Sequence, residues 1–155
     1  MPITVLVADD REILRKAIRS VLAHDGEIKI VGEAENFPET IALMRELSPN
    51  AVVMDLHMDA PEDFSPADIK RALRDTGSKL ITISIWQDDP SRALASSLGS
   101  FTFLDKYCLE TLLIPAIRQL TARPDASTEG RSLAGGICLS QATIAASIKF
   151  YHIKF

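Results

Sequence analysis

The chain has 155 residues, of which 46% are hydrophobic and 25% charged, and this fits one globular domain with a short appendage. Its net charge of -4 provides no general positive field, so we expect no direct nucleic-acid binding by this chain. The two cysteines, Cys108 and Cys138, form no C-x-x-C pair, so no zinc site or disulfide is expected. Without a leader pattern or a long apolar run, we expect a cytoplasmic protein and no membrane partner.

Apolar, β-branched runs alternate with helical patterns along most of the chain. The runs predict strands at residues 3–8, 28–32, 51–55, 79–84 and 101–104. The helical patterns predict helices at about residues 11–24, 36–47, 66–75, 90–98 and 109–120. Such alternation favours a parallel sheet with right-handed crossovers and helices on both faces.

Several helix ends have recognisable capping residues. The expected N-caps are Asn36, with Glu39 completing a capping box, Ser65, before Pro66, and Asp89, before Pro90. Gly99 is expected to end the fourth helix. Pro115 falls inside the last helical pattern and cannot donate a backbone hydrogen bond, so we expect this helix to be distorted or to begin late, near Thr111 or Leu112.

Polar side chains follow four of the predicted strands. They are Asp9 and Asp10 after the first, Asp55 at the end of the third, Ser84 at the end of the fourth and Lys106 after the fifth. Ligands of open parallel sheets bind just outside the carboxyl ends of the strands, so these residues indicate one site. Bringing the acids together requires the first and third strands to be neighbours. This requirement favours the doubly wound, flavodoxin-like (βα)5 sheet with strand order 2-1-3-4-5.

Residues 1–122 resemble the receiver domain of two-component response regulators in the acidic pair Asp9-Asp10, in Asp55, in Ser84 and in Lys106. The resemblance implies that Asp55 accepts a phosphoryl group from a histidine kinase or a phosphotransfer protein. It also implies that Ser84 and Lys106 contact the phosphoryl oxygens. Such a domain is not an enzyme in the usual sense, beyond weak self-dephosphorylation.

The resemblance also implies a cation site and a switch. Mg²⁺ would be held by Asp10, Asp55 and the backbone carbonyl of His57. Asp9 would support the metal indirectly, without binding it directly. Ser84 and Phe103 would form the switch. The chemistry agrees, because a carboxylate and a phosphoryl donor are both anionic and a hard, oxygen-liganded dication is needed to neutralise the developing charge.

Each of these residues also has a plain structural interpretation. Asp10 is a possible cap of the first helix, Lys106 a possible solvated loop residue, Ser84 a turn hydroxyl, Phe103 a core residue and His57 an exposed loop side chain. Trp86 is expected at the rim of the site, either shielding it from water or packing on neighbouring loops.

The sequence departs from the family pattern near the site. Ile85 is bulky where the family has a small residue, Asp59 stands where a proline is usual, and Tyr107 follows Lys106 where many members have a proline. We expect Ile85 to narrow access to the site and to slow dephosphorylation.

The remaining residues, 123–155, are expected to form a linker and a short helical tail. Residues 133–140 resemble the linker of LuxR-type helix-turn-helix regulators, so the expected function is control of a transcriptional output domain missing from this chain. The tail places Ile144, Ile148 and Tyr151 on one face, which suggests packing on the receiver or on a second chain as a homodimer. The alternative is a stand-alone receiver that docks to a protein partner. A flavodoxin-like ligand-binding or enzyme module is disfavoured, because no glycine-rich loop follows the first strand.

Overall fold

The computed structural model describes residues 1–122, and the expected linker and tail, with Cys138, Ile144, Ile148 and Tyr151, lie outside the described residues. The strands are β1 (Ile3–Ala8), β2 (Ile28–Ala34), β3 (Ala51–Asp55), β4 (Lys79–Ser84) and β5 (Thr102–Asp105). The helices are α1 (Glu12–Leu22), α2 (Phe37–Leu47), α3 (Pro66–Thr76), α4 (Asp89–Ser97), the short 3₁₀ helix η1 (Lys106–Cys108) and α5 (Leu109–Thr121). Within these residues no helix is long and apolar enough to cross a membrane.

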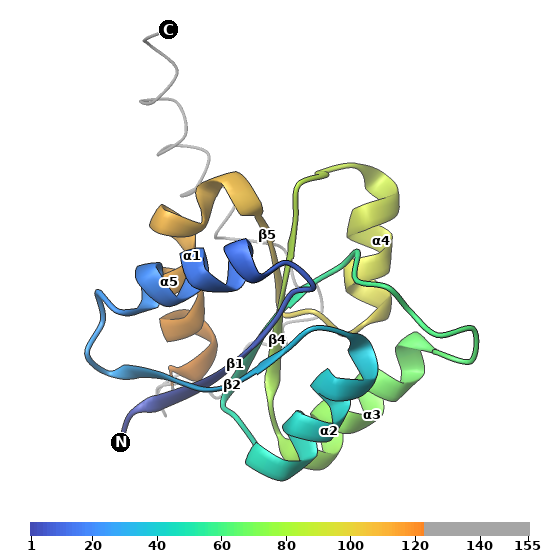
Figure 1. Ribbon diagram of the computed structural model, residues 1–155, viewed down its shortest axis with the longest axis horizontal. Coiled ribbons are helices and arrows are strands. Elements are labelled where there is room, and N and C mark those ends of the chain that lie inside the picture. Colours follow the sequence, from blue (N-terminus) through green and yellow to red (C-terminus); the bar gives the residue numbers. More distant parts are fainter. Residues whose placement is uncertain (123–155) are drawn as a thin grey trace, which may run out of the picture. The chain divides into compact units, whose positions relative to one another are not determined.

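The strands form one parallel sheet in the order β2-β1-β3-β4-β5. This order confirms the expected doubly wound, flavodoxin-like topology, in which β1 and β3 are neighbours. Figure 1 shows α1 and α5 on one side of the sheet and α2, α3 and α4 on the other. All five strands therefore present their carboxyl ends at the same edge.

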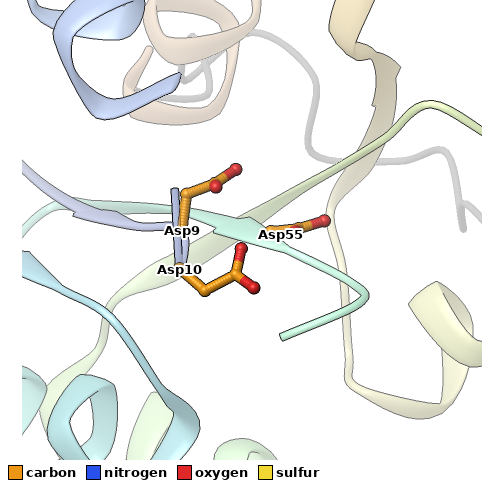
Figure 2. A group of neighbouring side chains, drawn as sticks. All are labelled: Asp9, Asp10 and Asp55. Carbon is orange, nitrogen blue, oxygen red and sulfur yellow. The ribbon is translucent and has the colours of Figure 1, made fainter. Parts of the chain in front are cut away.

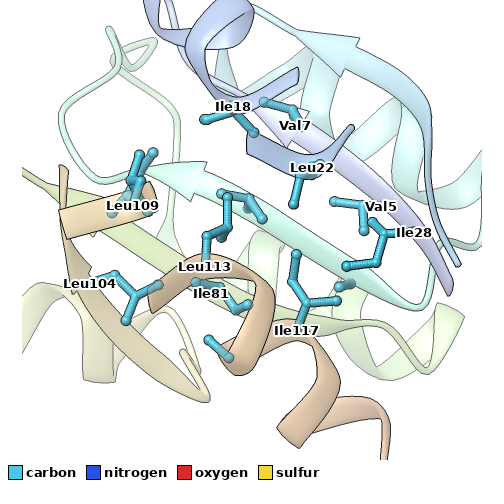
Figure 3. Close-up of a cluster of buried hydrophobic side chains, with 14 of the residues drawn as sticks. Val5, Val7, Ile18, Leu22, Ile28, Ile81, Leu104, Leu109, Leu113 and Ile117 are labelled. Carbon is cyan, nitrogen blue, oxygen red and sulfur yellow. The ribbon is translucent and has the colours of Figure 1, made fainter. Parts of the chain in front are cut away.

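Alternate side chains of the buried strands serve two separate cores, one on each face of the sheet. In β1, Val5 and Val7 pack in the core with Ile18, Leu113 and Ile117, which come from α1 and α5 (Figure 3). The other face of β1 packs in a second core beneath α2, α3 and α4; its central members are Leu6, Ala8, Met44, Ile69, Leu80 and Leu98. Burying both faces holds the central strands, and the residues at their ends, in fixed positions.

The capping predictions are confirmed in part. Ser65 caps α3 and forms a reciprocal capping box with Asp68. Asn36 caps α2 by accepting a hydrogen bond from the Glu39 N–H, but Glu39 does not complete a capping box, because its carboxylate accepts from the Glu35 N–H instead of the Asn36 N–H. The fourth helix is capped one residue earlier than expected, by Asp88, so the assignment of this role to Asp89 is wrong. An Asp at either position suits a helix start, and the sequence pattern does not distinguish them.

The expected late start of the last helix is also wrong. Helix α5 begins at Leu109 and continues through Pro115 to Thr121. Its buried side chains are Leu109, Leu113, Ala116, Ile117 and Leu120. Pro115 itself is exposed. Burial of the apolar face outweighs the lost backbone bond, because that loss costs about 3 kcal/mol whereas each fully buried leucine or isoleucine contributes about 1.5–3 kcal/mol.

Candidate functional site

The acids predicted to share a site lie together at the carboxyl edge of the sheet. The register pairs Ala8 of β1 with Met54 of β3, so the next residues, Asp9 and Asp55, end neighbouring strands side by side. One carboxylate oxygen from each of Asp9, Asp10 and Asp55 lies within 4.8 Å of the others. Figure 2 shows the three side chains next to one another where these two strands end.

Lys106 reaches this cluster from the end of β5, the strand at one edge of the sheet. Its Nζ lies 2.8 Å from an Asp9 oxygen and 3.0 Å from an Asp55 oxygen, and its side chain is only 4% exposed. Lys106 is the first residue of η1, which Asp105 caps by accepting a hydrogen bond from the Tyr107 N–H. From the turn after β5, the ammonium group thus reaches the acids at the ends of β1 and β3.

Asp9 and Asp10 differ sharply in their surroundings. Asp9 is fully buried, and its two carboxylate oxygens accept hydrogen bonds from the Arg11 backbone N–H at 3.0 Å and from Lys106 Nζ. Asp10 is exposed, and its carboxylate has no hydrogen bond or ion pair within residues 1–122. The alternative role of Asp10 as the cap of the first helix is not observed, because Arg11 occupies the N-cap position.

The donor set fits a hard divalent cation. Three carboxylates face one ammonium group, which leaves a formal charge of -2 in the cluster. Arg15, which reaches the same turn, is paired with Glu33 and Glu35 and contributes no net positive charge. Oxygen ligands in this number and charge are those that Mg²⁺ and similar cations prefer.

Ser84 and Phe103 belong to β4 and β5, the two strands on one side of β3, which ends in Asp55. Ser84 is fully buried at the end of β4, and its Oγ accepts a hydrogen bond of 3.0 Å from the Trp86 N–H. Phe103 of β5 is partly buried against the second core, and the Arg92 guanidinium of α4 lies 5.9 Å from its ring centroid. The structure therefore places both residues one strand or more from Asp55, on the side of α4.

His57 and Trp86 pack together at the rim of the site. Their rings meet edge to face with centroids 4.6 Å apart, and Trp86 remains half exposed. The His57 backbone N–H donates to an Asp55 oxygen at 3.2 Å. Packing of Trp86 on a neighbouring loop, one of its two expected roles, is thus observed.

Asp88, the N-cap of α4, accepts hydrogen bonds from Ser91. These bonds lower the pKa of the Asp88 carboxyl, which keeps the cap of α4 charged.

Sequence reasoning missed one buried charge, Arg15. Its guanidinium donates to the Asp9 carbonyl oxygen at 2.7 Å and pairs with Glu33 and Glu35 at the end of β2. The helical spacing of α1 places this residue near the apolar face, which was the available signal, but its partners are far along the chain.

Cys108 is partly buried, and burial raises the pKa of its thiol, so it has the character of an inert residue.

Comparisons with known proteins identify a family and relatives of the chain. The family profile described as Response regulator receiver domain matches residues 5–118. The response regulator protein VraR of Staphylococcus saprophyticus is 33% identical over 102 residues, which are 65% of this chain and 49% of that protein. Protein-glutamate methylesterase/protein-glutamine glutaminase 2 of Anaeromyxobacter dehalogenans is 31% identical over 105 residues, 68% of this chain and 30% of that protein.

Solved structures show the same fold. The response regulator domain of Thermotoga maritima CheB superposes with a TM-score of 0.67 at 22% identity, covering 80% of this chain and all of that one. The chain spans half or less of the length of the two curated relatives. It belongs to the response regulator receiver domain family.

Proposed function

We propose that Asp55 is the phosphoryl acceptor of a two-component signalling protein. The observation that carries this proposal is the position of Lys106, whose ammonium lies 2.8 Å from an Asp9 oxygen and 3.0 Å from an Asp55 oxygen. An isolated structural ion pair needs one carboxylate, whereas here one ammonium contacts two of three clustered carboxylates. Such an excess of negative charge at the end of parallel strands suits binding of a cation together with a phosphoryl group.

The cation in this proposal is Mg²⁺, held by Asp10, Asp55 and the backbone carbonyl of His57, with Asp9 behind them. When bound, Mg²⁺ would neutralise the negative charge that develops as a phosphoryl group approaches a carboxylate. Lys106 supplies a positive charge from the opposite side. Because Lys106 already contacts Asp9 and Asp55, it can follow a phosphoryl oxygen with a small movement.

Ser84 has the right chemistry for the switch. Its Oγ accepts a hydrogen bond from Trp86, so the hydroxyl hydrogen remains available to a phosphoryl oxygen on Asp55. Movement of Ser84 toward that oxygen would open space beside β4, into which Phe103 of the neighbouring strand can turn. Phosphorylation would then be communicated to α4, whose Arg92 lies over the Phe103 ring.

The phosphoryl donor in this proposal is a histidine kinase or a phosphotransfer protein, and the output is transcriptional. Residues 1–122 would form the receiver and residues 123–155 the linker to an output domain. The similarity to VraR, named a response regulator, supports this assignment. A relative named as a methylesterase shares the same receiver, so the receiver alone does not dictate the output.

The test is phosphorylation by a small donor such as acetyl phosphate, followed by intact-mass spectrometry. We expect one phosphoryl group to be added in the presence of Mg²⁺ and none in EDTA. Asp55→Asn should abolish the addition, whereas Asp59→Asn, which changes an exposed acid in the same loop region, should not. Equal modification of wild-type protein and Asp55→Asn would refute the proposal. If Ile85 excludes the small donor, a phosphorylated phosphotransfer protein replaces it with the same variants.

A further inference from the structure

Arg15 is a buried charge that the proposed phosphoryl chemistry does not use. It lies in the second turn of α1, and its side chain is only 8% exposed. Arginine is rarely buried unless it is paired. Each of the three guanidinium nitrogens donates one hydrogen bond to a partner at one of two strand ends: the Asp9 carbonyl oxygen at 2.7 Å, Glu35 at 2.8 Å and Glu33 at 3.2 Å.

The bond to the Asp9 carbonyl is the important one, because that oxygen belongs to the peptide joining Asp9 to Asp10. A trans peptide is planar, so fixing its carbonyl oxygen also fixes the direction of the following N–Cα bond. The Asp9 N–H is held as well, by the Ala34 carbonyl at 3.1 Å. All four polar atoms of Asp9 are thus bonded, two in the backbone and two in the carboxylate.

Asp10 depends on this backbone for its position. Within residues 1–122 its carboxylate has no hydrogen-bond partner, yet one of its oxygens lies within 4.8 Å of oxygens of Asp9 and Asp55. We propose that Arg15 is a positioning residue, which orients the Asp9–Asp10 peptide so that the Asp10 carboxylate faces Asp55 for cation binding. This inference rests on the proposed function, since it assumes that the acid cluster binds a divalent cation.

Helix α1 contains a matched control for Arg15. Arg19, one turn later, also pairs with Glu33 but makes no bond to Asp9. Arg15→Met and Arg19→Met both remove a guanidinium from the same helix and the same glutamate. They differ in whether the Asp9 carbonyl and the Glu35 carboxylate lose their donor. Arg15→Lys keeps the charge but replaces the planar fork by a single ammonium, which cannot serve all three partners at once.

The first measurement is the affinity for Mg²⁺ alone, by titration calorimetry of the full chain. Removal of a group that orients a metal ligand typically weakens metal binding by about 10- to 100-fold, so Arg15→Met should lose at least about tenfold. Arg15→Lys should fall between wild type and Arg15→Met. Arg19→Met should stay within about twofold of wild type, as is usual for a substitution that leaves the local backbone in place.

The second measurement needs no metal. The Asp9 and Arg11 amides are both hydrogen-bonded, and their hydrogen exchange in Mg²⁺-free protein should be faster in Arg15→Met than in wild type and unchanged in Arg19→Met. If Arg15→Met does not fold, Arg15→Lys serves for both measurements. Wild-type affinity together with wild-type exchange in a folded Arg15 variant overturns the positioning role. Failure of the wild-type chain to bind Mg²⁺ overturns the proposed function instead, and the exchange data then decide the backbone role of Arg15 separately.

Discussion

The two neighbouring acids at the end of β1 have opposite electrostatic surroundings. Asp9 is buried and bonded to Lys106, so its charge is compensated. Asp10 is exposed and unpaired within the described residues, and it faces the carboxylate of Asp55. The charge of Asp9 is attracted by Lys106 and stabilises the metal-free protein. The charge of Asp10 is repelled by Asp55 and destabilises it.

We therefore expect Asp10→Asn to stabilise the metal-free protein and Asp9→Asn to destabilise it. Like charges about 5 Å apart at a partly exposed site repel by about 1 kcal/mol, and Asp10→Asn relieves this repulsion. Asp9→Asn loses a charged hydrogen bond to Lys106, which is worth about 2 kcal/mol. Urea unfolding in EDTA measures both changes. Destabilisation by Asp10→Asn in EDTA would contradict the view that its carboxylate is unpaired.

At the scale of the elements, the sequence predicted strand and helix positions well because the buried patterns are strong. The apolar runs of β1, β3 and β4 are buried on both faces. Ser65, the N-cap, marks the start of α3 at Pro66. The pattern was less informative where long-range packing decides the outcome. Nothing local shows that Asp88 rather than Asp89 caps α4, or that Glu33 of β2 and Glu35 just after it pair with Arg15.

Helix α5 is the element in which tertiary packing most clearly overrides local preference. Pro115 is exposed in its middle, and it leaves the Thr111 carbonyl without the usual backbone donor four residues later. Pro115→Ala should therefore raise the free energy of unfolding by about 2 kcal/mol, which is the helix-interior penalty less the entropy that proline removes from the unfolded chain.

The control for this prediction is Gln119→Ala, at another exposed position of α5, which should change stability by less than about 0.5 kcal/mol. Both variants are compared with wild type by urea unfolding at the same pH. A loss of stability in Pro115→Ala would mean that the proline ring makes a contact that alanine cannot replace.

At the scale of the whole molecule, the requirements of the site predicted the topology. Alternating strands and helices left the strand order open, and only the need to place Asp9 and Asp10 beside Asp55 selected the order that the sheet has. The same edge also receives Lys106 and Ser84 from β5 and β4. Both residues come from the two neighbouring strands on the β4–β5 side of the acid cluster.

The last prediction concerns association of whole molecules. If Phe103 turns inward on phosphorylation, Arg92 loses the ring beneath it and the surface formed by α4, β5 and α5 changes. Exposed aromatic residues already border this region, with Phe101 51% and Tyr107 81% exposed. A change of only a few kcal/mol between two states suffices to create or remove a dimer surface there.

Sedimentation velocity tests this prediction on the full chain and on a chain ending at Ala122, each with and without a phosphoryl mimic such as beryllium fluoride. We expect the mimic to raise the sedimentation coefficient of the full chain, and Asp55→Asn to remove the response. A response that persists in the shortened chain would assign the dimer surface to residues 1–122, where α4, β5 and α5 lie. A response confined to the full chain would assign it to residues 123–155. A monomer in all four samples would contradict phosphorylation-driven self-association, and output would then depend on a different protein partner.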